Sequence, residues 1–599
     1  MINKTKNPIS KKLPAIIQLV KTAGAMIRAE FHRPEGPRGT LHKAIVDAEV
    51  EAFLKTNLMR LQPASWLGEE TESSLIGGSL TWVIDPHDGT ADFMKGLRGS
   101  AVSVALLENN TPILGVVYAP TAPDDAGDLI TWAKGGNLKR NGKVINPSGS
   151  QDKPIVGLNA DAADFALANH VSLKGLRVRT LPSPAYRLAL AAVGELDAAM
   201  SLVGGLSSWD IAGGHALIIG AGKVIAQRNG SPIDYSQTSF DGVVAGAEAL
   251  VRGLSGAQMT AHPKSARCPA VPCKRTNLPV SLSRAHGVLL GQLAGDALGS
   301  FVEFQEAETI ARRHPGGVDS LQDGGTWNLI AGQPTDDSEM ALALARSLCA
   351  MDRFDRDHVA NAYVEWRTSR PFDIGMTTSS AISALAQGDP VASDSQANGA
   401  LMRVSPIGVF ASGTPALAAE IARQDASLTH PNEVTVAANA AFAAAVSTGV
   451  AGGSKEDMWS SAYANAGQDE GAAIVRGRLL AARTKRPTEF QHQMGWVLTA
   501  FQNAFYCLMA EQSLRDAVVG TVACGGDTDT NAAICGALVG ALQGRDAVPL
   551  QWRNAVLTCR PVIADDIHHP RAKTYWPDDA LDLAEALLVA GAAANQDAI

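Results

Sequence analysis

Cysteine is scarce in this sequence, with 7 residues in 599, and the number is odd. An odd, dispersed set is not the disulfide framework that holds small secreted domains together. The pattern favours a reducing compartment, and we expect a cytoplasmic protein. The cysteines are Cys268, Cys273, Cys349, Cys507, Cys524, Cys535 and Cys559.

Strongly apolar runs and basic clusters are also missing. The stretch from Ala437 to Gly453 is alanine-rich and falls short of the roughly 20 strongly apolar residues that a membrane span needs. The lysine-rich start has its apolar residues at helical spacing and no small-residue cleavage site, so we expect neither a signal peptide nor a membrane segment. The net charge of −9, without a basic cluster, argues against nucleic-acid binding.

What remains is the composition of a folded globular protein, and the chain is long enough for two large domains. Up to about Leu254, helical stretches at 13–29 and 45–61 mix with short β-branched runs, which predicts a layered α/β/α, or α+β, domain. From Leu282 onward alanine-rich helical periods repeat and strand signals almost vanish. The second half is therefore predicted to be all-α. The β-branched runs are LTWVI, AVSVALL, ILGVVY and DLITWA.

Between the halves lies a segment rich in proline, serine and basic residues that has no apolar period. We therefore predict domains at 1–254 and 281–599, joined by an exposed linker at 255–280. Cys268 and Cys273 have the spacing of half a zinc site. Structural zinc needs four ligands and no second pair is nearby, so solvent-facing linker residues are the simpler interpretation.

The segment WVIDPHDGTADF places two carboxylates, Asp85 and Asp88, where a predicted strand passes into a turn. Together with the carbonyl of His87 they converge on one point, the all-oxygen environment that Mg2+ prefers. Taken alone, an acidic surface turn explains the segment equally well. A GEE triplet at 68–70 upstream, and Asp210 at a predicted helix start downstream, favour the metal site.

In this order and spacing the three segments resemble the inositol monophosphatase superfamily, whose pattern is GEE, DPxDGTxNF and WDxAAG. The similarity extends through SVALLENNTPILGVVYAP, the NGK at Asn141 and SPAYRLALAAVGELDA, and covers nearly all of residues 1–250. The resemblance implies a phosphomonoesterase that holds two to three Mg2+ or Mn2+ ions, because a phosphate dianion repels hydroxide unless cations neutralise its oxygens. By resemblance the metal ligands are Glu69, Asp85, the carbonyl of His87, Asp88 and Asp210, and Thr90 with Asp47 activates the attacking water.

The chain departs from this pattern in ways that bear on its substrate. LHKAIVD stands where the family shows a Val-Thr pair before the aspartate matched to Asp47, and DGTADF replaces DGTxNF. Val203 occupies the place where inositol-selective members carry an acidic residue that binds a sugar hydroxyl. We therefore expect a nucleotide or sugar phosphate in preference to inositol phosphate.

The second half contains two clusters of a hydroxyl with two carboxylates. PTDDSEMALALARSL supplies the first cluster and CGGDTDTNAAICGALVGALQG the second, each just before an alanine- or glycine-rich helix. For either cluster alone, helix capping is the simpler explanation. Together they provide oxygen ligands suited to a pair of Mg2+ or Mn2+ ions. The clusters are Thr335, Asp336 and Asp337, and Asp527, Asp529 and Thr530.

With GDALG followed by Glu303, NGALMRVSPIG from Asn398 and DASLTHPN from Asp425, these motifs resemble the ADP-ribosylglycohydrolase family in order and spacing, from about Ser281 to Ala590. The resemblance implies that the two clusters bind two metal ions, which hold the hydroxyls of the distal ribose. It places Glu303 and Asp373 near the anomeric carbon. It places Asn398, Gly399, Met402 and His430 near the nucleotide, with Trp496 stacking on the substrate.

We hypothesise a bifunctional metal-dependent hydrolase, which removes ADP-ribose from modified protein side chains, arginine by resemblance, and phosphate from a small molecule. One alternative is salvage of a phosphorylated ADP-ribose derivative or a nicotinamide nucleotide. Another is an immunity-type protein whose first half is a non-catalytic binding or occluding module. The expected partners are an ADP-ribosylated protein, or a small molecule that contains ADP-ribose, and a phosphomonoester.

Overall fold

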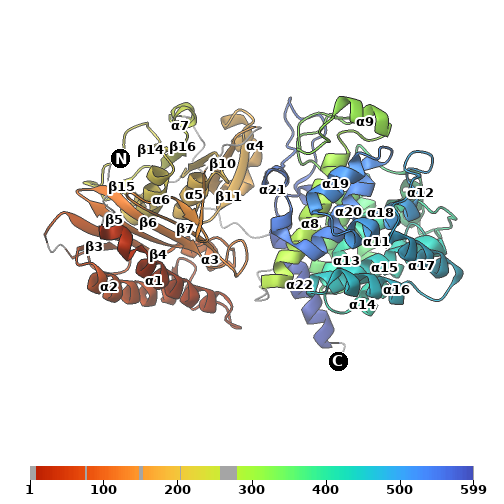
Figure 1. Ribbon diagram of the computed structural model, residues 1–599, viewed down its shortest axis with the longest axis horizontal. Helices are drawn as coiled ribbons and strands as arrows, with labels where there is room; N and C mark the ends of the chain where they lie inside the picture. The colour runs from red at the N-terminus through yellow and green to blue at the C-terminus, as the bar shows by residue number, and fades with distance from the viewer. Residues whose placement is uncertain (1–7, 75–76, 147–152, 203, 257–278, 598–599) are drawn as a thin grey trace. The chain divides into compact units, whose positions relative to one another are not determined.

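The computed structural model describes residues 8–74, 77–146, 153–202, 204–256 and 279–597. The chain divides into two compact units, Met1–Cys273 and Lys274–Ile599 (Figure 1). Most of the predicted linker at 255–280, including Cys268 and Cys273, lies outside the described residues.

The first unit mixes helices and strands, as predicted. Helices α1 (Pro8–Phe31) and α2 (Ile45–Leu61) contain the two helical stretches that the sequence indicates. The further helices are α3 (Thr90–Phe93), η1 (Ala160–Phe165), α4 (Ala166–Ser172), α5 (Pro184–Val193), α6 (Ser208–Gly220) and α7 (Glu248–Leu254). The strands are β1 (Gly39–Thr40), β2 (Lys43–Ala44), β3 (Ser65–Gly68), β4 (Leu80–Asp88), β5 (Ala101–Glu108), β6 (Thr111–Ala119), β7 (Asp128–Ala133), β8 (Lys139–Arg140), β9 (Lys143–Val144), β10 (Ile155–Asn159), β11 (Arg177–Leu181), β12 (Ala198–Met200), β13 (Leu206–Ser207), β14 (Val224–Gln227), β15 (Ser239–Phe240) and β16 (Val243–Gly246).

Two sheets alternate with layers of helices in this unit. The larger sheet has the order β3-β4-β5-β6-β7-β8-β9 and the smaller β11-β10-β12-β16-β14. Helices α1 and α2 cover one face of the larger sheet, α5 and α6 pack between the sheets, and α4 and α7 cover the outer face of the smaller (Figure 1). The four predicted β-branched runs form β4 to β7 in the larger sheet. The predicted layered α/β/α class is confirmed, with an additional sheet and helical layer.

Helix α6 lies unusually close to the larger sheet because glycines face each other at the contact. A Cβ on Gly115 of β6 would lie 2.5 Å from the carbonyl oxygen of Gly213 in α6. A Cβ on Gly213 would lie 2.4 Å from Oγ of Ser103 in β5. Real Cβ atoms do not approach so closely, so larger residues at either position would push α6 away. The close contact fixes the first turn of α6 over the end of the sheet.

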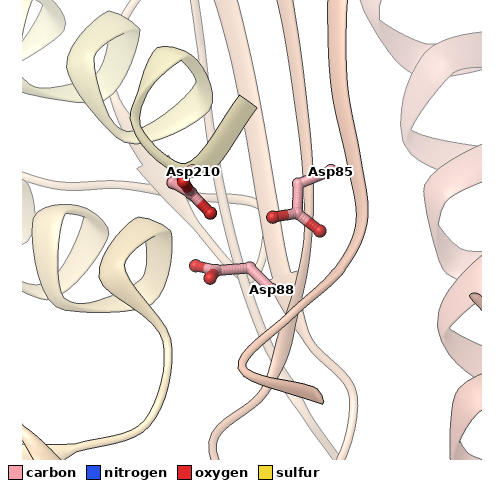
Figure 2. Close-up of side chains that lie close together, drawn as sticks. All are labelled: Asp85, Asp88 and Asp210. Atoms are coloured by element: carbon pink, nitrogen blue, oxygen red, sulfur yellow. The ribbon is translucent and has the colours of Figure 1, made fainter. Parts of the chain in front are cut away.

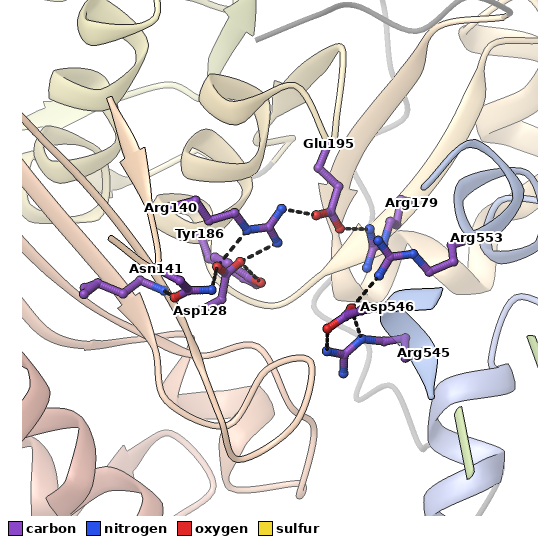
Figure 3. Close-up of polar contacts among 10 residues, drawn as sticks. Asp128, Arg140, Asn141, Arg179, Tyr186, Glu195, Arg545, Asp546 and Arg553 are labelled. Carbon is purple, nitrogen blue, oxygen red and sulfur yellow. Dashed lines mark hydrogen bonds and ion pairs between the residues drawn. The ribbon is translucent and has the colours of Figure 1, made fainter. Parts of the chain in front are cut away.

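A partly buried ion network joins β7 and β8 to the end of α5 and to β11 (Figure 3). Arg140 donates to both oxygens of Asp128, at 2.8 and 2.7 Å, and its Nη1 lies 2.7 Å from Glu195. Glu195 also pairs with Arg179 at 2.6 Å. Asn141 of the NGK motif adopts φ 49°, and its side chain accepts a hydrogen bond from the Leu129 amide at 2.9 Å. The NGK motif therefore builds a turn at the edge of the larger sheet.

Within the described residues of the second unit the regular elements are all helices, apart from isolated bridges, which confirms the predicted all-α class. Its helices are α8 (Pro279–Gly299), α9 (Ala307–Arg313), α10 (Asp336–Met351), α11 (Arg356–Thr368), α12 (Met376–Gln387), η2 (Asn398–Arg403), α13 (Ser405–Phe410), α14 (Pro415–Ala426), α15 (Glu433–Val450), α16 (Lys455–Asn465), α17 (Glu470–Ala482), α18 (Val497–Met509), α19 (Leu514–Val522), α20 (Thr528–Gln543), η3 (Arg545–Ala547), α21 (Leu550–Leu557), η4 (Lys573–Tyr575) and α22 (Ala580–Asp597).

Helices α8 and α20 lie side by side in the most extensive contact between two helices in the described part of the chain. Glycines recur at every fourth position of α8, and a Cβ on any of them would lie within 2.4 Å of a backbone oxygen of α20. The helices are antiparallel, since Gly287 faces Gly540 and Gly299 faces Thr528. The contact therefore brings the end of α8 against the start of α20. The glycines are Gly287, Gly291, Gly295 and Gly299.

Helix α15 is the described helix that is long and apolar enough, by length and composition, to cross a membrane. However, 83% of its apolar window is buried inside the structure, as in the core helix of a globular domain.

Candidate active sites

The first candidate site forms where β4 ends. Asp85 and Asp88 lie on this strand and are buried. Gly89 follows with φ 94°, a left-handed conformation that glycine adopts without strain, and α3 begins at Thr90. Asp85 stabilises this turn, because its Oδ1 accepts a hydrogen bond from the His87 amide at 2.9 Å. The strand-to-turn junction predicted from the sequence is therefore present.

Asp210 completes a group of three carboxylates. It lies in the first turn of α6, the helix that packs closely on the sheet, and accepts from the Ser207 amide at 2.5 Å. One carboxylate oxygen from each of Asp85, Asp88 and Asp210 lies within 4.8 Å of the others (Figure 2). The start of α5 holds Asp88 in place. The Asp88 carboxylate accepts hydrogen bonds from the hydroxyl of Ser183 and from the Ala185 amide.

Glu69 reaches the same cluster from the loop after β3, and its carboxyl group hydrogen-bonds with that of Asp85. The loop is fixed by a residue that the sequence analysis missed. Glu51 of α2 is fully buried and accepts from the Glu70 amide at 2.7 Å and the Thr71 amide at 3.0 Å. Its position four residues after Asp47, on the same face of the helix, is the one signal in the sequence that indicates it.

The pKa values of the acidic residues reflect crowding of like charges. Desolvation raises the pKa of Asp85 well above its usual value, and the charges of Glu69 and Asp88 raise it further. Desolvation likewise raises the pKa of Asp88, with the charge of Asp210 adding to it, and raises that of Asp210 to about 6. Glu69 is exposed as a whole residue, but its carboxyl group faces the cluster, and desolvation raises its pKa to about 7. A positive charge in the cluster would relieve this repulsion.

Asp47 and Thr90, predicted to activate water, lie together beside the cluster. The Thr90 hydroxyl lies 3.2 Å from Asp47 Oδ2 and 2.7 Å from the carbonyl oxygen of His87. The sequence analysis used only the carbonyl of His87. The structure adds its buried imidazole, whose Nδ1 lies 2.6 Å from Asp47 Oδ1 and whose Nε2 lies 3.0 Å from Ser100 Oγ.

The second candidate site forms where α8, α10 and α20 meet. Asp296, which follows Gly295 on α8, is fully buried and accepts from the Thr335 amide at 3.1 Å and the Thr335 hydroxyl at 2.9 Å. It also accepts from the Ser338 amide at 3.1 Å. Asp296 therefore fixes the start of α10. It was missed as a site residue, although it stands inside the GDALG motif.

The metal ligands predicted at the starts of α10 and α20 lie close together beside Asp296. The hydroxyls of Thr335 and Thr530 lie 3.0 and 3.3 Å from Asp337 Oδ2. Oxygens of Asp296, Asp337 and Asp529 lie within 4.8 Å of one another. Asp337 Oδ1 is buried without a hydrogen-bond partner. An unpaired, buried carboxylate oxygen in an all-oxygen cluster fits a bound cation.

The remaining predicted ligands belong to the same cluster. Desolvation, together with neighbouring carboxylates that include Asp527, raises the pKa of Asp336 well above its usual value. Asp527 accepts from Asn398 Nδ2 at 2.6 Å. The two glycines before it face neighbouring backbone, because a Cβ on Gly525 would lie 2.6 Å from the Gln305 carbonyl oxygen. The CGGDTDT segment is thereby locked against the loop that carries Glu303.

Glu303 and Asp373 lie next to this cluster, and their carboxylate oxygens come within 4.8 Å of Asp529. Glu303 Oε2 accepts from Trp327 Nε1 at 2.6 Å. Burial raises the pKa of Glu303 to about 8, with the charge of Asp373 adding to it. Burial also raises the pKa of Asp373 to about 6, helped by Asp527. The structure thus brings together the two residues predicted near the anomeric carbon.

The residues predicted to lie near the nucleotide belong to η2 and to segments close to it. A Cβ on Gly399 would lie 3.0 Å from the His430 ring, so glycine permits this contact. His430 is buried, its Nε2 has no hydrogen-bond partner, and burial lowers its pKa to about 3. Met402 is buried, and its carbonyl accepts from Gln292 Nε2 at 2.9 Å. Trp496 donates to Gln396 Oε1 at 2.9 Å, and the guanidinium of Arg478 lies 4.8 Å from its ring centre.

Comparison with known proteins matches one family to each half of the chain. The inositol monophosphatase family model matches residues 10–260, and the ADP-ribosylglycohydrolase model matches residues 278–590. The chain belongs to both families. The inositol monophosphatase domain is 30% identical over 240 residues to inositol monophosphatase 2 from Solanum lycopersicum, covering 36% of this chain and 88% of that protein.

The ADP-ribosylglycohydrolase domain is 31% identical over 278 residues to ADP-ribosyl-(dinitrogen reductase) glycohydrolase from Rhodospirillum rubrum, covering 45% of this chain and 88% of that protein. It is 29% identical over 291 residues to ADP-ribosylarginine hydrolase Tri1 from Pseudomonas putida, covering 45% of this chain and 74% of that protein. Both families are metal-dependent hydrolases, and the oxygen-only clusters of both domains fit divalent cations.

Proposed function

We propose that the ADP-ribosylglycohydrolase domain removes ADP-ribose from arginine side chains of modified proteins, and that the inositol monophosphatase domain hydrolyses a nucleotide or sugar phosphate. The observation that carries the proposal is the pair of buried carboxylate clusters, each placed at the ends of elements that glycines hold in close contact. Arginine is supported by the relative named an ADP-ribosylarginine hydrolase.

In the ADP-ribosylglycohydrolase domain, two Mg2+ or Mn2+ ions bound by the two clusters would neutralise the carboxylates and orient the hydroxyls of the distal ribose. Breaking the glycosidic bond builds positive charge on the ribose, which a nearby carboxylate stabilises. The proximity of Glu303 and Asp373 to the second cluster supports their assignment to this role. Burial raises the pKa of Glu303, which supports this residue as the group that gives a proton to the leaving side chain. Trp327 keeps that carboxyl group in one orientation.

In the inositol monophosphatase domain, two to three Mg2+ ions on the carboxylate cluster would neutralise the phosphate and lower the pKa of bound water. The contact between Thr90 and Asp47 supports their assignment as the groups that would orient that water and accept its proton. The acidic residue that would select inositol is replaced by Val203, which lies outside the described residues. The expectation of a nucleotide or sugar phosphate therefore still depends on the sequence.

We also propose that the protein works in the cytoplasm. The proposal is supported by the small, odd and dispersed set of cysteines in the sequence.

The test uses the full-length protein and two variants, each of which is the control for the other. Asp88→Asn should abolish Mg2+-dependent phosphate release and leave release of ADP-ribose from ADP-ribosylarginine protein unchanged. Asp337→Asn should have the opposite effect. If Asp88→Asn leaves phosphate release intact, the phosphatase assignment is wrong. If the wild type releases ADP-ribose from serine-linked substrate but not from arginine-linked substrate, the arginine assignment is wrong.

The phosphatase substrate is identified by a panel of inositol 1-phosphate, adenosine 3′,5′-bisphosphate, ADP-ribose phosphates and NADP, each with Mg2+ and with chelator. We expect the nucleotide phosphates to be turned over at least as well as inositol 1-phosphate. A clear preference for inositol 1-phosphate would contradict the proposal. A lack of metal-dependent turnover with every compound would favour a binding module.

A further inference from the structure

Three aromatic rings form a row beside Glu303 and Asp373, and the proposed reaction uses only the indole N–H of the middle one, Trp327. The ring centres of Phe304 and Trp327 lie 6.4 Å apart, and those of Trp327 and Phe372 lie 5.8 Å apart. Phe304 directly follows Glu303, and Phe372 directly precedes Asp373. Each outer ring of the row therefore belongs to a residue that is the sequence neighbour of a carboxylate in the site. The middle ring, Trp327, is connected to Glu303 by a hydrogen bond.

The row is held in place by unusual backbone. Phe304 has φ 64°, a left-handed conformation that costs a bulky side chain free energy. Its amide donates to the Gly526 carbonyl at 2.8 Å, so the segment that carries the metal ligands holds it there. The side chain of Phe304 is nevertheless 57% exposed. The backbone is thus strained in a position that leaves a phenyl ring in solvent.

The rings are also free of the chain's own cations. The described part of the chain contains several pairs of a cation over a ring, such as Arg403 over Tyr363 and Arg478 over Trp496, but none involves this row. One side of Phe372 is supported by His569, with ring centres 4.5 Å apart. Aromatic faces beside two carboxylates form an environment that attracts an external cation, both through the ring quadrupole and through charge.

We propose that Phe304, Trp327 and Phe372 form the subsite that binds the leaving side chain. The aromatic rings of this subsite, together with the neighbouring carboxylates, select a guanidinium group. This inference rests on the proposed function and identifies the side chain from which ADP-ribose is removed. A planar guanidinium stacks on aromatic faces and hydrogen-bonds to carboxylates at the same time. A hydroxyl acceptor has no charge to place there, so the row favours arginine over serine.

The test compares the full-length wild type with Phe372→Leu and Phe372→Tyr on ADP-ribosyl-agmatine, a small substrate whose leaving group is a guanidinium. Leucine keeps apolar bulk but removes the aromatic face, whereas tyrosine keeps that face. We expect Phe372→Leu to lower kcat/KM by about three- to thirtyfold, mainly through KM, and Phe372→Tyr to stay within about twofold. Inhibition by ADP-ribose, which lacks the leaving group, should not change in either variant.

Two further variants keep the result interpretable. Phe304→Leu removes an exposed ring and should reproduce the loss even if substitutions at Phe372 impair folding. Tyr463→Leu removes a partly exposed ring on α16, stacked on Trp459, and should leave kcat/KM unchanged. An unchanged KM in Phe372→Leu and Phe304→Leu, or an equal weakening of ADP-ribose inhibition, would overturn the subsite. A wild type that cannot cleave ADP-ribosyl-agmatine would instead refute the proposed arginine activity.

Discussion

The imidazole Nδ1 of His87 lies 2.6 Å from Asp47 Oδ1, inside the first domain, with both side chains buried. The other nitrogen of the ring lies 3.0 Å from Ser100 Oγ, and the ring edge packs on Phe93, with centres 4.3 Å apart. His87 is therefore held from three sides, and it fixes the aspartate that faces Thr90. A group that orients a catalytic carboxylate acts on rate through that carboxylate.

We predict that His87→Leu lowers kcat for phosphomonoester hydrolysis by about ten- to hundredfold with little change in KM, because Asp47 loses its orienting partner. His87→Asn should retain more activity, since its side-chain amide can replace Nδ1 at Asp47. The backbone carbonyl of residue 87 is present in both variants, so the Mg2+ concentration needed for half-maximal rate should not change. A rise in that concentration, or equal rates in both variants and wild type, would contradict the positioning role.

The metal clusters lead to a second prediction, on the ADP-ribosylglycohydrolase domain. Asp336→Ala or Asp527→Ala should abolish release of ADP-ribose while the protein stays folded, because losing one carboxylate unbalances a clustered cation pair. In wild type, Mg2+ should raise the melting temperature of this domain by neutralising buried like charges, and the rise should shrink in both variants. Glu420→Gln, which alters an exposed carboxylate on α14, serves as the control. Wild-type turnover in both alanine variants would show that these residues do not hold the ions.

A third prediction concerns pH and the first domain. His215 of α6 is largely buried, its Nδ1 lies 3.1 Å from the Tyr235 hydroxyl, and burial lowers its pKa to about 4. At a pH below the ordinary histidine pKa, His215 is protonated in the unfolded state but stays neutral in the folded state. The stability contributed by neutral His215 is therefore lost as pH falls toward 4.

The loss should reach about 1–2 kcal/mol at about pH 5. His215→Asn keeps a polar group near Tyr235 and does not titrate in this range. Calorimetry at about pH 7 and about pH 5 should therefore show the wild type losing more stability on acidification than the variant. Parallel losses in the two proteins would show that His215 does not titrate as inferred.

The sequence predicted the helical and strand segments well where the apolar pattern is strong, as in α1 and in the run from β4 to β7. It also identified acidic residues that stand in compact motifs, such as Asp85 and Asp88. It missed Glu51, His87 as a side chain and Asp296, whose roles depend on partners far away in the chain. No local pattern shows that Asp296 of α8 will meet Thr335, because the contact forms only when α8 packs against the start of α10.

A fourth prediction is that the two domains fold and work independently. The chain divides into two compact units, and the segment around 255–280 has no apolar period to tie it to either. Limited proteolysis should therefore cut first between Leu254 and Leu282, and both fragments should keep their own activities. First cuts inside a domain, with this segment left intact, would contradict independence.

The last prediction tests the contact on which the second site is built. A Cβ on Gly291 would lie 2.2 Å from the carbonyl oxygen of Gly536, which is backbone and cannot rotate away. Gly291→Ala should therefore separate α8 from α20, destabilise the domain by about 1–3 kcal/mol and move Asp296 away from Thr335 and Asp529. Activity should fall further than stability alone explains, because the metal ligands come from both helices.

Gly477 of α17 is the matched control, since nothing lies within 4 Å of the Cβ position there. In this open helical site Gly477→Ala should stabilise the domain by about 0.5–1 kcal/mol, because alanine loses less backbone entropy on folding. Calorimetry of both variants, with assay of ADP-ribose release below the melting temperature, separates the two effects. If Gly291→Ala is as stable and active as Gly477→Ala, close packing of α8 on α20 is not what assembles the site.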